Sequence, residues 1–375
     1  MIKFLLHLSF IVIMVAVTFY PIVASGEMCS ISYVVMKQDD AEENILFGLG
    51  YTDRNVYYKM QSTIRRDPEV LALGSSRVMQ IRKDFFSEPE LFYNAGGAAR
   101  DAAEMQCFLE QLPENNRLKL VIIGIDQWSY NYNYTGELSG PEPLYFTDTT
   151  LNKTLDFKNT LSKIIDDYIN QKLRLSQLVV NTNRIGVNAK VNENGFLNDG
   201  SYYYGSRFSE KNNPDQHWFE DTFQRIENGD RRFEYGYEVN EKAVEQMDAF
   251  LKYCRQRNIY VIGFEPPFPS SVLQRMSAKG DDYSYIDEIP KRMEEVFEKY
   301  QFEFYDYSDV GGLGCGADSY FIDGFHGGDA VYALMFQDML TKSSHLGIYC
   351  EEASLSTLYH DRDSDVAVYG SYGQY

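Results

Sequence analysis

The segment VLALGSSR, residues 70–77, contains a pattern that recurs along the chain. Its first part, Val70-Leu71-Ala72-Leu73, is a short continuous apolar run, which is typical of a strand buried on both faces. Gly74 and two serines then interrupt the run, and we expect a helix after them. A strand, a glycine-containing turn and a helix in this order predict one unit of a parallel sheet.

The same order of elements recurs on the C-terminal side of this segment. Apolar runs predict strands at 91–94, 118–125, 259–264 and 302–305, and amphipathic patterns predict helices at about 98–112, 241–257, 286–300 and 329–340. Continuous apolar strands separated by helices indicate a sheet covered on both faces. We therefore predict an α/β fold with a doubly wound, flavodoxin-like, mainly parallel five-stranded sheet and a large insertion. Such sheets bind ligands at the carboxyl ends of their strands.

The composition divides the chain into five parts. We expect a targeting segment at 1–25, a helical lead-in at 26–65, the α/β domain at 66–130 and 239–348, an insertion or cap at 131–238, and a tail at 349–375. The insertion is rich in Tyr, Asn, Gly and Asp and has one helical patch near 161–178. The tail is acidic and then rich in Gly, Tyr and Ser, so we expect it to be loose.

The overall composition is that of a globular protein, and its charge excludes some partners. Of the 375 residues, 44% are hydrophobic and 24% are charged. The 55 acidic and 35 basic residues give a net charge of −20. This charge argues against sequence-independent binding to nucleic acid and against basic docking on an anionic membrane. The 30 tyrosines fit either a ligand-stacking surface or a tyrosine-rich core.

The first 25 residues predict export. Lys3 precedes an apolar run from Phe4 to Ala24, and Val23-Ala24-Ser25 resembles a cleavage site for signal peptidase. A run of about 20 apolar residues can also span a bilayer, so a cleaved signal peptide and a retained anchor both remain open. The acidic residues at 39–43 fit an N-terminus that stays inside. In both cases the rest of the chain is extracytoplasmic.

The cysteine spacing and the missing motifs argue against metal and nucleotide chemistry. The five cysteines form no CxxC pair, and there is no HExxH motif and no P-loop. We expect Cys107 and Cys254 to be small core residues, whereas a pair between Cys315 and Cys350 stays open. The sequence therefore predicts no metal and no cofactor.

A carboxylate and a histidine lie three residues apart in a glycine-containing loop, DGFHGG at 323–328. Asp323 can accept a hydrogen bond from Nδ1 of His326, which leaves Nε2 free as a general base. Such a base can activate Ser76, whose backbone N–H at a helix start can stabilise an oxyanion. In the alternative interpretation, Ser75 and Ser76 cap the following helix.

Four short blocks in this order resemble the SGNH (GDSL-like) hydrolase superfamily. They are GSSR at 74–77, NAGG at 94–97, GIDQW at 124–128 and DGFH at 323–326. The serine block and the Gln-Trp pair are similar to exported D-alanyl transfer proteins of teichoic acid modification. The serine block is also similar to alginate and peptidoglycan O-acetyltransferases. The resemblance covers about 66–130 and 240–342. The absence of a GxSxG elbow argues against an ordinary α/β-hydrolase.

The resemblance implies a role for each block. Ser76 would be the nucleophile, Asp323 and His326 would complete the triad, and the N–H of Gly96 would join the oxyanion hole.

The third block departs from the family. Most members have an Asn whose amide donates to the oxyanion, and here Asp126 takes this place. A carboxylate accepts hydrogen bonds and cannot donate them. Gln127 can donate, but neighbouring strand positions face opposite sides. Arg77 and Trp128 are the candidate substrate contacts, and a structural ion pair is the alternative role for Arg77.

These features together predict an exported serine esterase or O-acyltransferase. The resemblance to small exported members of the superfamily implies acetyl as the acyl group, carried by a cell-envelope or extracellular glycan and resolved from the serine by water or by a polymer hydroxyl. The expected partners are this acylated polymer and a membrane protein that exports acyl groups. A non-catalytic glycan-binding or assembly protein and a D-alanyl transfer protein are the alternatives.

Overall fold

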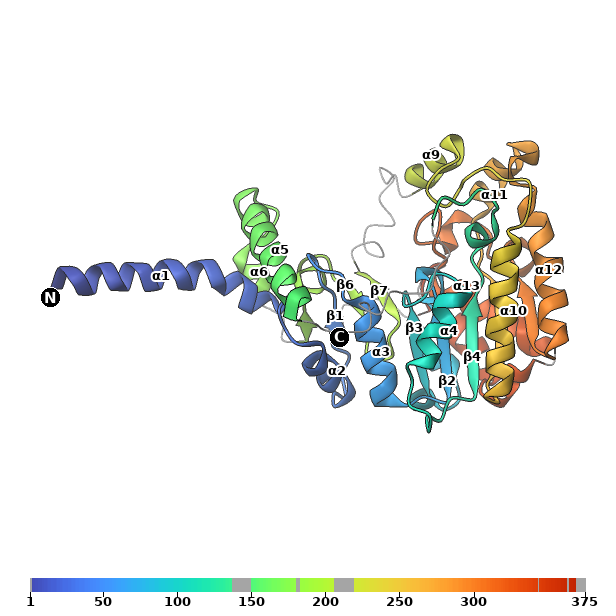
Figure 1. Ribbon diagram of the computed structural model, residues 1–375, viewed down its shortest axis with the longest axis horizontal. Coiled ribbons are helices and arrows are strands. Elements are labelled where there is room, and N and C mark those ends of the chain that lie inside the picture. The colour runs from blue at the N-terminus through green and yellow to red at the C-terminus, as the bar shows by residue number, and fades with distance from the viewer. Residues whose placement is uncertain are drawn as a thin grey trace.

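The computed structural model describes residues 2–136, 150–179, 183–205, 219–342, 344–362 and 364–368. At its centre is a five-stranded sheet in which every neighbouring pair is parallel. Its strands are β2 (Val70–Gly74), β3 (Phe92–Gly96), β4 (Leu120–Gly124), β8 (Tyr260–Glu265) and β9 (Glu303–Asp306). The spatial order β3-β2-β4-β8-β9 is that of a doubly wound sheet (Figure 1). The predicted α/β class is confirmed.

Helices cover both faces of this sheet. One face packs against α4 (Ala102–Glu110), α10 (Glu241–Gln256) and α12 (Tyr285–Lys299), and the other packs against α13 (Asp329–Thr341). Strands β2, β3 and β4 are buried along their whole length, β8 is buried except at Tyr260, and the edge strand β9 is half-buried to exposed. Successive side chains of a strand point to opposite faces, so each buried strand contributes to both cores. In β2, for example, Leu71 and Leu73 enter the first core, whereas Val70 and Ala72 enter the second.

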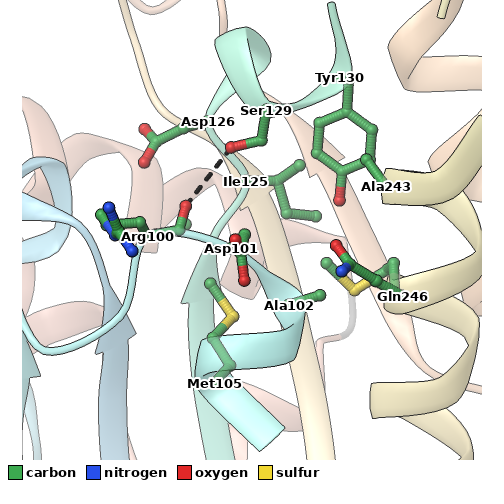
Figure 2. A pocket seen from close by; sticks show the side chains of 12 residues that line it. Arg100, Asp101, Ala102, Met105, Ile125, Asp126, Ser129, Tyr130, Ala243 and Gln246 are labelled. Atoms are coloured by element: carbon green, nitrogen blue, oxygen red, sulfur yellow. Dashed lines mark hydrogen bonds between the residues drawn. The ribbon is translucent and has the colours of Figure 1, made fainter. Parts of the chain in front are cut away.

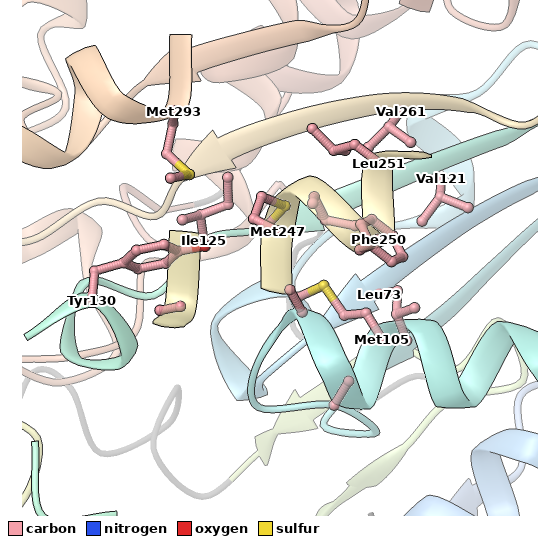
Figure 3. Close-up of a cluster of buried hydrophobic side chains, with 14 of the residues drawn as sticks. Leu73, Met105, Val121, Ile125, Tyr130, Met247, Phe250, Leu251, Val261 and Met293 are labelled. Atoms are coloured by element: carbon pink, nitrogen blue, oxygen red, sulfur yellow. The ribbon is translucent and has the colours of Figure 1, made fainter. Parts of the chain in front are cut away.

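Figure 3 shows the first of these two cores. Met105 of α4, Phe250 of α10 and Met293 of α12 pack with strand residues such as Val121 and Val261. These side chains are no more than 2% exposed. This core and its counterpart on the other face hold the strands in place, so the loops at their carboxyl ends start from rigid positions.

A second sheet joins the lead-in to the insertion. Its strands are β1 (Leu46–Phe47), β5 (Arg184–Ile185), β6 (Asn194–Phe196) and β7 (Tyr202–Tyr204), in the order β5-β1-β6-β7. The lead-in at 26–65 contributes α2 (Ile31–Asp39), β1 and α3 (Asn55–Arg66). The lead-in is therefore more than a helical connector, because its one strand pairs with strands from the insertion.

Within its described residues, the insertion also contains four helices, α5 (Thr150–Ile169), α6 (Leu175–Val179), α7 (Val187–Val191) and α9 (Glu220–Asn228). Of these, only α9 follows the last strand of this sheet in the sequence. The helical patch predicted near 161–178 is thus two helices with a break between them. Helix α9 packs against α11 (Ser270–Ser277), which follows β8 in the α/β domain. In Figure 1, α9 and α11 lie near one another at one end of the domain.

Helix α1 (Ile2–Ser25) projects away from the rest of the molecule, and α5 and α6 contact its C-terminal end (Figure 1). The export prediction rests on this segment. Many of its side chains lie outside the described part of the structure. Within the described part of the chain, no helix combines the length and the apolar character that a membrane crossing requires.

The tail is more ordered than its composition predicted. Residues 352–360 form α14 (Glu352–His360), which packs on α13 and buries Leu355 completely. Val366 and Val368 are also buried, and the N–H of Val368 donates to Asp329 Oδ1 over 2.8 Å. The prediction of a loose tail is wrong for these residues, because Leu355 and Val368 join the core around α13 and Val366 packs with Ile322. Residues 369–375 lie outside the described part.

Candidate active site

Ser76 lies where the first strand of the central sheet ends. Strand β2 stops at Gly74, and Ser75 caps a short 3₁₀ turn at Ser76–Val78 by accepting the N–H of Arg77 over 3.2 Å. A single 3₁₀ turn takes the place of the α-helix that was expected after the serines. Of the two serines considered as caps, only Ser75 takes this role. The hydroxyl of Ser76 is therefore not used by the cap.

The loop that carries Asp323 and His326 folds around the aspartate. Asp323 Oδ1 accepts the backbone N–H groups of Phe325 and His326 over 2.8 and 2.9 Å. The imidazole Nδ1 of His326 lies 3.0 Å from the same oxygen and 3.1 Å from Oδ2. These contacts orient the ring and leave its Nε2 pointing away from the carboxylate.

The structure brings this ring to Ser76, which is distant in the sequence. His326 Nε2 lies 2.9 Å from Ser76 Oγ, within hydrogen-bond distance. The His326 and Asp323 side chains are 18% and 14% exposed, and Ser76 is half-buried. A small ligand can reach all three groups. Chemically, the arrangement joins a hydroxyl, a base and an orienting carboxylate in one hydrogen-bonded chain, which is how serine nucleophiles are activated.

The insertion supplies one wall of this site. Tyr204, the last residue of β7, places its ring 5.9 Å from the imidazole of His326, and Tyr202 packs against it at 4.7 Å. Tyr203, between them, points the other way and is buried. The tyrosine run at 202–204 was the sequence feature that could have located this wall. Because β7 belongs to a different sheet, its proximity to His326 was not predictable from spacing.

Gly96 does not play the part that the resemblance implied. Its backbone N–H donates to Asn94 Oδ1 over 2.7 Å, so it already has an acceptor. The Asn94 amide in turn donates to the carbonyls of Val78 and Ile81. Asn94 therefore ties β3 to the turn after Ser76. Within the described residues, the backbone N–H of Ser76 has no acceptor, and it is the oxyanion donor that remains.

Arg77 is a structural residue and not a substrate contact. Its side chain is 1% exposed. It donates to Gln127 Oε1 and to the carbonyls of Pro266 and Pro267, each over 2.8 Å. Burial lowers the pKa of the Arg77 guanidinium, and Asp126 partly opposes this effect. The expectation that Arg77 reaches a ligand is wrong, because its donors hold together the loops after β2, β4 and β8.

Asp126 and Gln127 are both buried behind the nucleophile. Gln127 is fully buried, and its Oε1 accepts from Arg77. Asp126 Oδ1 lies 3.6 Å from Arg77 Nη1. Burial raises the pKa of Asp126 to about 6, although the charge of Arg77 and a hydrogen bond with Ser75 lower it. Neither side chain faces solvent, and both lie against Arg77, while the Nε2 amide of Gln127 has no hydrogen-bond partner among the described residues.

Trp128 is 2% exposed and stacks on Phe325, with ring centroids 5.1 Å apart. The expectation that it contacts substrate is wrong, because the loop before His326 covers one side of its ring. Arg232, which the sequence did not single out, lies over the same indole, with its Cζ atom 4.9 Å from the ring centroid.

A small cavity lies behind Asp126, and Figure 2 shows the side chains around it. Its volume is about 10 Å³, which is enough for one water molecule. Tyr130 and Gln246 point toward one another across it, whereas the Asp126 side chain points away from Tyr130. Ser129 Oγ donates to the carbonyl of Arg100 at its edge over 3.4 Å. The cavity is too small for a substrate.

Among the described residues, no cluster of three or more His, Cys, Asp or Glu side chains could hold a metal ion. All five cysteines are free, so Cys315 and Cys350 do not pair. Cys254 is buried as expected, whereas Cys107 is half-buried.

Comparison with known proteins adds no assignment to this geometry. The chain matches no protein-family model and no curated protein sequence.

Proposed function

We propose that this protein is a serine esterase or O-acyltransferase of the SGNH type. The single observation that supports the proposal is the chain of hydrogen bonds from Ser76 through His326 to Asp323. It lies at the carboxyl end of β2 in a doubly wound sheet, where such folds bind their ligands. The order of the four sequence blocks agrees with it.

In the proposed reaction, His326 Nε2 takes the proton of Ser76 Oγ as the oxygen attacks an ester carbonyl. Asp323 stabilises the imidazolium that forms, and the N–H of Ser76 donates to the developing oxyanion. The imidazolium then gives its proton to the departing alcohol, which leaves an acyl group on Ser76. Water or the hydroxyl of an acceptor attacks this ester in the same way and restores the serine.

We propose acetyl as the acyl group and a cell-envelope or extracellular glycan as its carrier. The apolar N-terminal segment supports an exported location, either anchored or secreted. If the protein is a transferase, a membrane protein that exports acyl groups would supply its donor. The tyrosine side chains of β7 next to His326 offer the stacking surface that a sugar ring needs.

A non-catalytic glycan-binding protein is the second candidate, and one observation favours it. The N–H of Gly96 is engaged by Asn94, Asp126 faces Arg77, and the amide of Gln127 is fully buried, which leaves the N–H of Ser76 as the donor beside the half-buried hydroxyl. D-alanyl transfer is a third candidate that would use the same nucleophile. Hydrolysis of D-alanyl esters in preference to acetyl esters would identify it.

Labelling with a fluorophosphonate probe tests the proposal. We expect the probe to modify Ser76 and the protein to hydrolyse p-nitrophenyl acetate. Ser76→Ala should abolish the labelling and lower the hydrolysis rate by several orders of magnitude. Ser162→Ala, a change at an exposed position of α5, is the matched control and should behave like the wild type. A folded protein that neither reacts with the probe nor cleaves the ester would favour the non-catalytic candidate.

A further inference from the structure

The guanidinium of Arg232 lies at the same end of the sheet as the candidate triad. Its Cζ atom is 4.9 Å from the ring centroid of Trp128 and 5.9 Å from that of Phe325. Phe325 directly precedes His326, and their ring centroids are 5.3 Å apart. A short series of ring contacts therefore joins Arg232 to the imidazole that contacts Ser76.

The backbone around Arg232 is strained. Arg231 and Arg232 have φ values of 50° and 81°, in the left-handed region that side chains with a Cβ disfavour. The left-handed conformation brings the Cβ too close to the following carbonyl oxygen, so such residues persist only where the surrounding fold holds them. The turn is held by Phe233, which is buried between the rings of Phe268 and Phe325, and by the N–H of Arg232, which donates to Glu234 Oε2 over 3.0 Å. The fold accepts this strain and thereby places Arg232 over the indole.

The charge of Arg232 has no counterpart within the described residues. No carboxylate pairs with its guanidinium, and no acceptor binds it there. The neighbouring Arg231 pairs with both Asp221 and Asp230. This difference is notable in a chain with a net charge of −20, where carboxylates outnumber basic groups. The Arg232 side chain is half-buried, so part of it remains accessible to a ligand.

The field of this cation reaches the buried groups behind the nucleophile. Burial is the main cause of the lowered pKa of Arg77, and repulsion by Arg232 adds to it. The charge of Arg232 also opposes the burial-induced rise in the pKa of Asp126. Arg77 has Asp126 as its counter-charge, whereas no carboxylate among the described residues pairs with Arg232. A half-buried cation without such a pair therefore lies near the candidate triad.

We propose that Arg232 binds an anionic group, a carboxylate or a phosphate, on the substrate whose ester Ser76 attacks. This inference rests on the proposed function and names a feature of its substrate. A guanidinium binds either anion with two parallel hydrogen bonds, and the indole of Trp128 holds one face of its plane. Cation–π contact alone leaves its N–H donors unused, and an anion would satisfy them. It would also offset the repulsion that this acidic protein exerts on a negatively charged substrate.

Paired substrates test the subsite. The probes are acetylated galacturonate trimers, which carry carboxylates, and acetylated xylotriose, which is neutral. Arg232→Gln should raise KM for the acidic trimer at least tenfold at low salt and change kcat less than twofold. It should leave the kinetics with xylotriose unchanged. Arg231→Gln is the matched control, because it removes a neighbouring arginine that already has partners, and it should have no effect on either substrate.

Direct binding separates this inference from the proposed function. Calorimetric titration of the full chain with oligogalacturonate, oligo(glycerol phosphate) and a neutral xylo-oligosaccharide requires no catalysis. We expect one of the two anions, and not the neutral sugar, to bind in a salt-dependent way that Arg232→Gln removes. The anion that binds identifies the group as a carboxylate or a phosphate. Absence of esterase activity with this binding intact would count against the proposed function alone.

A second variant distinguishes loss of anion binding from loss of folding. Arg232→Gly removes the side chain and also relieves the left-handed backbone, so its melting temperature should not fall because of strain. It should lose anion binding as Arg232→Gln does. Equal effects of both variants on acidic and neutral substrates, or no effect on either, would overturn the inference.

Discussion

Arg77 Nη1 lies 3.6 Å from Asp126 Oδ1, and both side chains are buried behind Ser76. Asp126 takes the position at which the SGNH family has an oxyanion donor, and its carboxylate faces Arg77. Burial raises the pKa of Asp126 to about 6 even with this cation beside it. The pair is therefore a structural element under the nucleophile, and it links the loops that follow β2 and β4.

We expect Asp126→Asn to lower kcat/KM for p-nitrophenyl acetate about tenfold at neutral pH, equivalent to about 1.4 kcal/mol. The reason is that Arg77 loses its counter-charge, and Arg77 also holds the carbonyls of Pro266 and Pro267. Steady-state kinetics with a parallel thermal melt would measure the change. A tenfold gain instead would show that the site lacked a hydrogen-bond donor which the new amide supplies.

Asp323→Asn should reduce kcat by about 10³–10⁴-fold with little change in KM. The amide oxygen can still accept the N–H groups of Phe325 and His326, so the loop should keep its shape. The uncharged amide of the Asn side chain, however, cannot stabilise the imidazolium that forms on His326. Asp361→Asn, at an exposed position after α14, is a suitable control. A rate within threefold of the wild type would remove Asp323 from the proposed triad.

Asp101 should make the folded state less stable as the pH rises from about 4 to about 6. Burial raises its folded-state pKa to about 6, above the usual value of about 3.9. The folded state therefore binds the proton more tightly, and the stability gained from that proton is lost as the pH passes through this window.

Asp101→Asn tests this sign. Asp101 Oδ1 caps α4 by accepting the N–H of Glu104 over 2.9 Å, and Asn can keep this cap. Relative to the wild type, the variant should gain about 2–3 kcal/mol of unfolding free energy between about pH 4 and pH 7. Urea melts at both pH values would measure it. Parallel pH profiles for the two proteins would contradict the assignment.

Lys59→Met should loosen the connection between the insertion and the central sheet. The buried ammonium of Lys59 donates to the carbonyl of Asn94 over 2.8 Å and also to that of Gly200. Burial lowers its pKa well below the usual value. Methionine fills similar space over the Phe196 ring but leaves two buried carbonyls without a donor, at about 1–3 kcal/mol each.

Thermal unfolding and limited proteolysis would measure this change. We expect a melting temperature lower by several degrees and faster cleavage near residues 199–204. The comparison is Lys83→Met, at a half-buried position of a nearby turn. Lys83 contacts Asp199 through its backbone N–H, so the substitution keeps this contact. Unchanged proteolysis in the Lys59 variant would show that the second sheet holds the insertion without this lysine.

Local sequence was enough to predict the sheet and one half of the candidate site. The apolar run at 70–74 predicts a buried strand because no other element of that length buries every side chain. The spacing of Asp323 and His326 predicts their contact because a three-residue separation in a tight loop leaves the side chains within reach of each other. Both inferences depend on neighbours in the chain, and the structure agrees with both.

The residues around the nucleophile were harder to interpret, because residue type defines hydrogen-bonding capacity but not which partner uses it. The N–H of Gly96 was available in the sequence, yet Asn94 Oδ1 accepts it in the fold. Arg77 could have faced a ligand, but the loops after β4 and β8 close over it. Burial and partner choice follow from how loops from separate strands pack together.

The sequence by itself determined the α/β class, the positions of the strands along the chain and the Asp323–His326 pair, since each follows from apolar periodicity or short spacing. Tertiary structure alone decided that His326 meets Ser76 across 250 positions and that β7 places Tyr204 beside them. It also decided that Arg232 lies over Trp128 without a counter-charge among the described residues. Each of these contacts joins segments that are distant in the chain. The segments come together only because the two sheets and their helices pack and bury their apolar side chains.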